Sequence, residues 1–277
     1  MSTDRPGAVP ASRLAGFTAI GLAELNGQAA LLKRLERKYV LDPASLDGLF
    51  DVLRFSHAVL EIDGLRSHGY QSRYYDTPDL LCFRAHNQGR ANRFKLRVRR
   101  YEDSGLAFCE LKEKTRVAAT AKSRVPLSDP ADLGDDFGGL LGRIRQIAGA
   151  AADHRFLPTL DVGYRRITLF DARDQTRVTI DSGLSFGHAS DPGVHQGTAS
   201  VIVEVKSARP MSLTDRLLRD AGLRPQAQMS KYCIGLLACG LWTGSSRFGA
   251  NHRRLGCRPV EEVGRSMAPA EAPACAS

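Results

Sequence analysis

Charged and apolar residues alternate along several short segments of the chain. The clearest case covers residues 93–101, where Arg93, Lys95, Arg97 and Arg99 alternate with apolar residues such as Leu96. In a β-strand, residues two apart share a face, so this spacing predicts a strand with one cationic and one apolar face. Guanidinium forks grip two oxygens of a phosphate at once, and lysine ammonium groups act as point charges. The chemistry that this pattern predicts is the binding of a phosphate compound.

The same alternation recurs in five further segments. The charged residues that share a face in them are Glu36 and Lys38, Glu110 and Lys112, Lys122 and Arg124, Arg177 and Asp181, and Glu204 and Lys206. A single charged strand face usually points to solvent. Six charged strand faces that contain few neutral polar residues favour an enclosed surface instead. Eight strands closed into a barrel leave a lumen wide enough for side chains or a small ligand. Because unpaired buried charge is strongly disfavoured, such a lumen calls for a polyanion carrying a metal ion.

Turn signals every ten to fifteen residues predict an antiparallel β protein rather than alternating βαβ units. We expect strands over residues 35–41, 71–76, 93–101, 106–115, 119–125, 162–171, 177–184 and 200–207. We expect helices over residues 43–55, 138–149 and 213–221, and a last helix from 229 or 230 to about 241. The predicted fold class is α+β, mainly antiparallel β, with an eight-stranded closed β-barrel tunnel and flanking helices.

Composition describes a soluble globular protein of 277 residues, 43% apolar and 25% charged. The formal net charge of +9 favours an anionic partner but does not choose among phosphate compounds, nucleic acid and membrane surfaces. Residues 1–22 and 243–277 lack a hydrophobic period, so we expect disorder there and a folded domain over 23–242. Most of the net charge stays in that domain.

Six cysteines without a C-x-x-C pair indicate neither a zinc site nor a disulfide framework. The N-terminal residues lack the apolar stretch of a signal peptide. The most apolar run, residues 232–242, is too short for the ~20 residues that span a bilayer. These features favour a cytoplasmic protein with reduced thiols and no membrane span, and they leave its oligomeric state open.

Nine short segments, taken in order, resemble the VTC-domain polyphosphate polymerases of the triphosphate tunnel metalloenzyme (CYTH-like) superfamily. The segments are Glu36-Arg37-Lys38-Tyr39, Arg73-Tyr74-Tyr75-Asp76-Thr77, Leu96-Arg97-Val98-Arg99-Arg100-Tyr101, Glu110-Leu111-Lys112, Lys122-Ser123-Arg124, Tyr164-Arg165-Arg166, Arg177-Val178-Thr179-Ile180-Asp181, Glu204-Val205-Lys206 and Ser230-Lys231-Tyr232. Each is weak by itself, but their joint order and spacing is a specific signal over residues 35–237.

The resemblance implies an enzyme that moves the γ-phosphate of ATP onto a growing inorganic polyphosphate inside a basic tunnel, with no specific nucleic-acid partner. It implies catalytic roles for Lys38, Arg97, Arg99 and Lys231. It implies phosphate contacts for Lys112, Lys122, Arg166 and Arg177, and it makes Glu204 the ligand of Mn²⁺ or Mg²⁺. Phosphoryl transfer needs positioning and charge neutralisation more than covalent help, so the lack of an obvious general base is consistent with this activity.

Two positions depart from the family pattern. The hydrolytic CYTH relatives begin with E-x-E-x-K, and Arg34 stands at the first Glu, which favours the polymerase branch. The closing K-F-S-K motif begins with Gln228, so one basic contact is missing. A triphosphate or tripolyphosphate hydrolase and a non-catalytic polyphosphate-binding module remain the alternatives. We interpret Asp76 as part of a turn, and Glu36 and Glu110 as partners of nearby cations rather than metal ligands.

Overall fold

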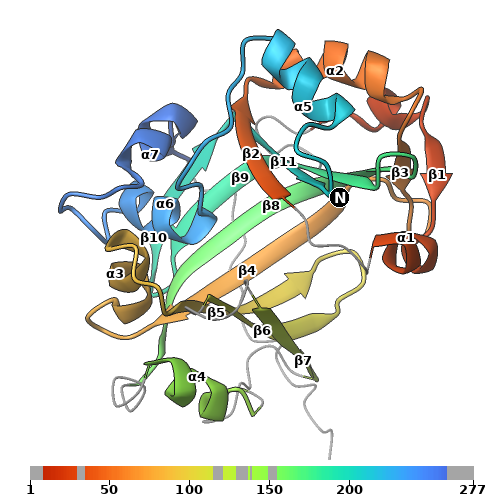
Figure 1. The fold of residues 1–277 in the computed structure, drawn as a ribbon. Helices are drawn as coiled ribbons and strands as arrows, with labels where there is room; N and C mark the ends of the chain where they lie inside the picture. The colour runs from red at the N-terminus through yellow and green to blue at the C-terminus, as the bar shows by residue number, and fades with distance from the viewer. Residues whose placement is uncertain are drawn as a thin grey trace, which may run out of the picture.

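Two long antiparallel strands, β8 (Leu157–Asp171) and β9 (Thr176–His188), form the centre of the sheet (Figure 1). The side chain of Asp171 accepts hydrogen bonds from the backbone N–H groups of Arg173 and Asp174, which closes the turn between the strands. This computed structural model describes residues 9–29, 35–114, 121–128, 137, 139–148 and 155–260. Arg34 therefore lies outside the described residues.

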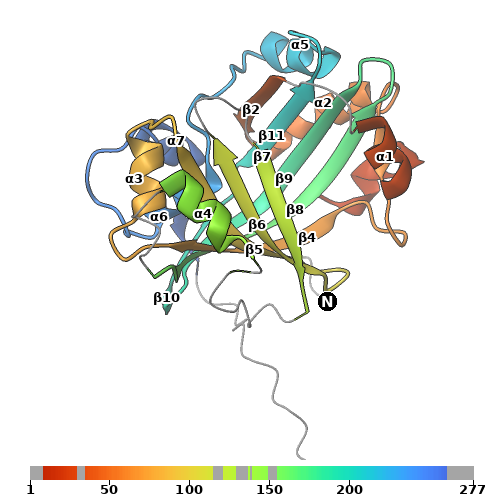
Figure 2. The same ribbon diagram turned by 60° about the horizontal axis from the view of Figure 1, so that its bottom comes forward.

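The other principal strands continue the sheet on both sides of this hairpin. The order is β2-β11-β9-β8-β4-β5-β6-β7, and every neighbouring pair is antiparallel. Their bounds are β2 (Leu35–Leu41), β4 (His68–Asp76), β5 (Arg93–Tyr101), β6 (Ala107–Lys114), β7 (Ala121–Leu127) and β11 (Val201–Ser207). The sheet curves, so that β6 and β7 stand in front of its centre (Figure 2). All eight strands that alternation predicted are present.

The prediction of a closed barrel is wrong. Among the described residues no backbone pairing joins β2 to β7, the two ends of this order, so the sheet stays open. At the free edge of β2, the carbonyl oxygen of Lys38 accepts a hydrogen bond from the backbone N–H of Gln226, 2.6 Å away. The segment that precedes the last predicted helix therefore occupies part of the edge that closure would need.

Helices pack on both faces of the sheet, and the first two groups cover its outer, apolar face. Helices α2 (Leu46–Leu53) and α5 (Leu213–Asp220) pack on the β2-β11-β9-β8 part through Phe50 and Leu218. Helix α4 (Leu141–Ala148) packs Ile144 on the β5–β6 part. Helices α3 (Leu81–Asn87), α6 (Lys231–Ala238) and α7 (Gly249–Leu255) gather at one side (Figure 1), where α6 packs against Leu160 and Phe186 on the opposite, inner face. The apolar alternate residues of the strands thus form the core, as their pattern predicted.

The described parts of both chain ends are ordered, unlike the disorder that we expected over 1–22 and 243–277. Residues 11–14 form a 3₁₀ turn, β1 (Thr18–Ile20) pairs in parallel with β3 (Ala58–Leu60), and Leu14 is buried. After residue 243, Phe248 and Leu255 are buried, and β12 (Arg258–Pro259) pairs with β10 (Asp191–Thr198). The remaining elements are α1 (Leu22–Ala29) and a 3₁₀ turn over Pro43–Ser45 that Asp42 caps. Within the described residues, no helix is long and apolar enough to cross a membrane.

Candidate functional site

The charged alternate residues lie together on the inner face of the sheet, opposite α2, α4 and α5, and α6 covers one end of this inner face. On neighbouring strands β2 and β11, Lys38 stands opposite Glu204, and Lys206 on β11 stands opposite Arg177 on β9. Lys38 Nζ lies 3.5 Å from the Glu204 carboxylate, and Lys206 Nζ lies 2.5 Å from it. The register of the strands therefore gathers cations around one carboxylate.

Strands β2 and β6, which are far apart in the strand order, approach each other across this face. Lys112 on β6 is electrostatically coupled to Glu36 and Lys38 on β2, although the two strands do not pair. The protein atoms around the amine, together with the nearby positive charges of Lys38 and Lys95, lower the pKa of Lys112 to about 8. The inner face is therefore concave, and its cations lie close enough to repel one another.

A buried carboxylate, Glu110, holds the cations of β5 and β7. It accepts hydrogen bonds from Nε and Nη2 of Arg97 at 2.9 and 2.6 Å, and from Lys122 Nζ at 2.5 Å. Arg99 Nη1 lies 3.7 Å away. Burial alone would raise the pKa of Glu110, but the positive charges of Arg97, Arg99 and Lys122 outweigh it and lower this pKa to about 2. The interpretation of Glu110 as a partner of cations is confirmed.

A second buried carboxylate, Asp181 on β9, holds cations from two other elements. Arg166 on β8 donates to both of its oxygens at 2.6 and 2.8 Å, and Lys231 at the first turn of α6 donates at 2.5 Å. Both cations also face the ring of Tyr164, at 5.3 and 4.7 Å from its centroid. Burial opposes ionisation of Asp181, but Arg166 and Lys231 lower its pKa to about 2. Asp181 was not among the predicted site residues.

The solvent exposure of the side chains differs between parts of the inner face. Most of its predicted phosphate contacts are half-buried, with Lys38 at 22% and Arg97 at 19% side-chain exposure. Lys112 and Lys122 are exposed. The β6–β7 part of the face is therefore more open to solvent than its centre, as expected for a sheet that does not close.

Comparison with known proteins identifies the family. The sequence profile of the VTC domain matches residues 33–239. The chain belongs to the VTC domain family. No curated protein sequence matches it.

Several solved structures are similar to this VTC domain at low sequence identity. A putative adenylyl cyclase from Hippeastrum, described as having a dominant triphosphatase activity, is 16% identical over 73% of this chain and 95% of its own, with a TM-score of 0.45. A putative adenylate cyclase from Bacillus halodurans is 14% identical over 72% and 94%, with a TM-score of 0.47. The Pct1 RNA triphosphatase of S. pombe is 11% identical over 81% and 77%, with a TM-score of 0.27.

The VTC domain offers Glu204 as a donor for a hard metal ion. Burial opposes its ionisation, but Lys38 and Lys206 hold the pKa of this carboxyl well below its usual range. Within the described ranges, no group of three or more His, Cys, Asp or Glu residues forms a ready metal cage. Mg²⁺ is commonly held by one or two carboxylates plus substrate phosphates, so an ionised Glu204 on a cationic face fits such an ion. Glu36 pairs with Lys38 at 2.6 Å, as we interpreted it.

One residue on the inner face, Lys95, was not assigned a role from the sequence. It alternates with Arg97 along β5 and stands opposite Lys112 on β6. Its Nζ donates to Ser230 Oγ at 2.9 Å, and Ser230 caps α6 by accepting from the backbone N–H of Cys233. Burial lowers the pKa of Lys95. The alternation of charged residues along β5 could have identified Lys95 from the sequence.

Asp76 and the turn before α6 have structural roles in the VTC domain. The Asp76 carboxylate is buried and accepts hydrogen bonds from the backbone N–H groups of Thr77, Cys82 and Phe83 and from the hydroxyl of Tyr232. It therefore caps the start of α3 and holds α6, which confirms its interpretation as a turn residue. Gln228, which replaces a basic family residue, adopts φ +58° in the turn.

Proposed function

We propose that this VTC domain is a metal-dependent polyphosphate polymerase that transfers the γ-phosphate of ATP to a growing inorganic polyphosphate. The observation that carries the proposal is the excess of cations over carboxylates on one concave sheet face, as far as the described residues show. Each of Glu110 and Asp181 already holds two or more cations, and Lys95 and Lys112 add further positive charge. A linear polyanion complements such a face.

The inner face supplies what phosphoryl transfer needs. The transferred group requires in-line positioning and neutralisation of its charge, and little covalent chemistry. Two nitrogens of Arg97 donate to one oxygen of the buried Glu110, and two nitrogens of Arg166 donate to the two oxygens of the buried Asp181. These paired contacts fix the directions of the remaining guanidinium N–H groups. Lysines such as Lys38 and Lys112 can follow a chain that slides, because an ammonium group has no required contact plane. The acceptor phosphate is already ionised, so no general base is needed.

Glu204 would hold the divalent ion, Mn²⁺ or Mg²⁺, on this face. Such an ion, when bound, neutralises charge on the phosphate oxygens and shields them from one another. Lys38 and Lys206 orient the Glu204 carboxylate in the free protein and are close enough to contact the same phosphates. We therefore assign catalytic contacts to Lys38, Arg97, Arg99 and Lys231. We assign phosphate-binding contacts to Lys95, Lys112, Lys122, Arg166 and Arg177.

The test is chain synthesis by the purified full-length protein with ATP and either Mn²⁺ or Mg²⁺. We expect acid-stable phosphate chains on gels, and loss of synthesis in Lys38→Ala and Arg97→Ala with the fold retained by circular dichroism. Arg100→Ala is the matched control, since Arg100 is exposed on β5. Synthesis that survives both site changes would contradict the site assignment.

The same assay distinguishes the alternatives. Release of orthophosphate without chain growth would replace the polymerase by a triphosphate hydrolase. Tight binding of polyphosphate without turnover under either ion would replace it by a non-catalytic polyphosphate-binding module.

A further inference from the structure

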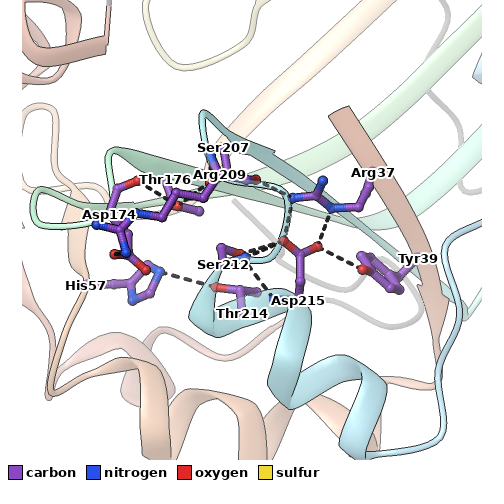
Figure 3. A network of polar contacts seen from close by, with 10 residues as sticks. All are labelled: Arg37, Tyr39, His57, Asp174, Thr176, Ser207, Arg209, Ser212, Thr214 and Asp215. Carbon is purple, nitrogen blue, oxygen red and sulfur yellow. Dashed lines mark hydrogen bonds and ion pairs between the residues drawn. The ribbon is translucent and has the colours of Figure 1, made fainter. Parts of the chain in front are cut away.

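A buried carboxylate on the outer face of the sheet contacts both sequence neighbours of Lys38. Because side chains alternate along β2, Arg37 and Tyr39 point to the outer face while Lys38 points to the inner face. Asp215, in the first turn of α5, accepts hydrogen bonds from Arg37 Nε and Nη2 at 2.7 and 2.6 Å and from the hydroxyl of Tyr39 at 2.8 Å (Figure 3). One carboxylate thus fixes the two side chains that flank Lys38.

Asp215 is itself held firmly. Its side chain is fully buried, and Ser212 donates to it from both the backbone N–H and the hydroxyl, at 3.0 and 2.7 Å. Ser212 Oγ in turn accepts from the backbone N–H of Asp215, which completes a capping box at the start of α5. Buried carboxylates with this many donors have little freedom to move. The anchor on β2 is therefore rigidly attached to α5.

The backbone of Lys38 is held from a second direction by the segment that follows α5. The N–H of Gln226 donates to the Lys38 carbonyl at 2.6 Å. Four residues further on, the same segment reaches Ser230, which contacts Lys95, and then Lys231, which contacts Asp181. The α5–α6 connection therefore links the outer-face anchor to two cationic positions on the inner face.

We propose that Asp215 is a positioning residue for phosphate binding, which acts by fixing β2 so that Lys38 projects onto the inner face at the right place. β2 needs such an anchor because it is the last strand of the order, and within the described part of the chain it pairs along one edge only, with β11. Asp215 is not in a position to touch a phosphate, since it lies on the other side of the strand. This proposal rests on the proposed function, because it assumes that Lys38 contacts phosphate.

The test is a double-mutant cycle on the full chain, with inorganic tripolyphosphate as the probe and binding measured by calorimetry. Asp215→Asn keeps the shape of the side chain but removes the charge that holds Arg37. We expect it to weaken binding about tenfold in the wild-type background and to have no further effect in a Lys38→Met background. Asp171→Asn, at another buried carboxylate at the β8–β9 turn, is the control for general destabilisation and is expected to leave binding unchanged.

Tyr39→Phe provides a milder variant if Asp215→Asn does not fold, because it removes one donor and leaves the Arg37–Asp215 pair. It should weaken binding less and show the same dependence on Lys38. If the losses from Asp215→Asn, or from Tyr39→Phe in its place, simply multiply with the loss from Lys38→Met, the positioning role is wrong. If wild-type protein does not bind tripolyphosphate at all, the proposed function itself fails. Wild-type binding with multiplied losses would overturn only the role of Asp215.

Discussion

Each buried carboxylate of the inner face stabilises the fold by holding cations that would otherwise repel one another. The pKa of Glu110 is lowered from 4.5 to about 2, and its side chain is only 1% exposed. A carboxyl whose pKa is lowered by folding binds fewer protons in the folded state, so its contribution is fully present above about pH 4.5. That contribution is lost as the pH falls from 4.5 towards 2. At 1.36 kcal/mol for each pKa unit, it is about 3 kcal/mol at neutral pH.

We predict that Glu110→Gln lowers the free energy of unfolding at pH 7 and makes its dependence on acid shallower. At pH 7 the neutral amide cannot balance the positive charges of Arg97 and Lys122. In wild-type protein the contribution of the Glu110 carboxylate to the free energy of unfolding decreases as the pH falls below 4.5. Urea denaturation of both proteins at pH 7 and at pH 3 measures the difference. A gap between the two proteins that is as large at pH 3 as at pH 7 would contradict the assignment of the lowered pKa.

Lys95 carries a second residue-scale prediction. Lys95→Met removes a charge from a group that donates to Ser230 and stands opposite Lys112. We expect about tenfold weaker binding of tripolyphosphate, the size of one charge-assisted contact. Lys95→Arg should retain most of the affinity, and Arg100→Met, on the same strand, should leave it unchanged. Equal affinities of Lys95→Met and wild-type protein would remove Lys95 from the site.

At the scale of elements, Lys231 reaches the inner face from the first turn of helix α6. The position of this helix depends on Tyr232. The Tyr232 hydroxyl donates to the buried Asp76, and its ring stacks on Tyr74 with centroids 5.0 Å apart. We predict that Tyr232→Phe lowers the free energy of unfolding by about 1–3 kcal/mol, because Asp76 loses a donor in a buried setting. Tyr232→Phe should also weaken tripolyphosphate binding, because a shift of α6 moves Lys231. Tyr101→Phe, at a half-buried strand end, is the control in thermal unfolding and calorimetry, and equal behaviour of the two variants would contradict the role given to α6.

Local patterns predicted the elements that repeat a simple period. The strands β2 and β5 have the bounds expected from alternation, and α5 begins after the expected Ser212 cap. The short strands β1 and β3 and the Pro- and Gly-containing β10 carry little periodic signal, so they were missed. Closure of the barrel depends on what lies along the free edge of β2. Gln226 is remote in sequence from Lys38, and alternation cannot reveal such a contact.

At the scale of the whole molecule, the sharing of one sheet face by the charged residues was predictable, because strand alternation is local and each strand shows by its own pattern which residues share a face. The supporting contacts of the candidate site were not predictable. Arg37 and Asp215 are 178 residues apart, and only the docking of α5 on β2 brings them together. Asp181 was visible as a charged alternate residue, but its role in holding Arg166 and Lys231 requires the register of β8 and β9 and the place of α6.

The positive charge concentrated on the inner face is expected to lower the stability of the free protein, while the same charge favours the binding of a phosphate chain. In the free protein Lys112 lies near Lys38 and Lys95, and this repulsion disfavours the folded state. We therefore expect Lys112→Met to raise the melting temperature of the free protein slightly, while Arg100→Met does not. Tripolyphosphate should raise the melting temperature of wild-type protein, by the equivalent of about 2.7 kcal/mol at a hundred times its dissociation constant, and should raise that of Lys112→Met less. Sodium chloride at equal ionic strength is the reference in the same thermal scans. A sodium chloride effect as large as that of tripolyphosphate would show screening of charge alone, and it would contradict a site built for a phosphate chain.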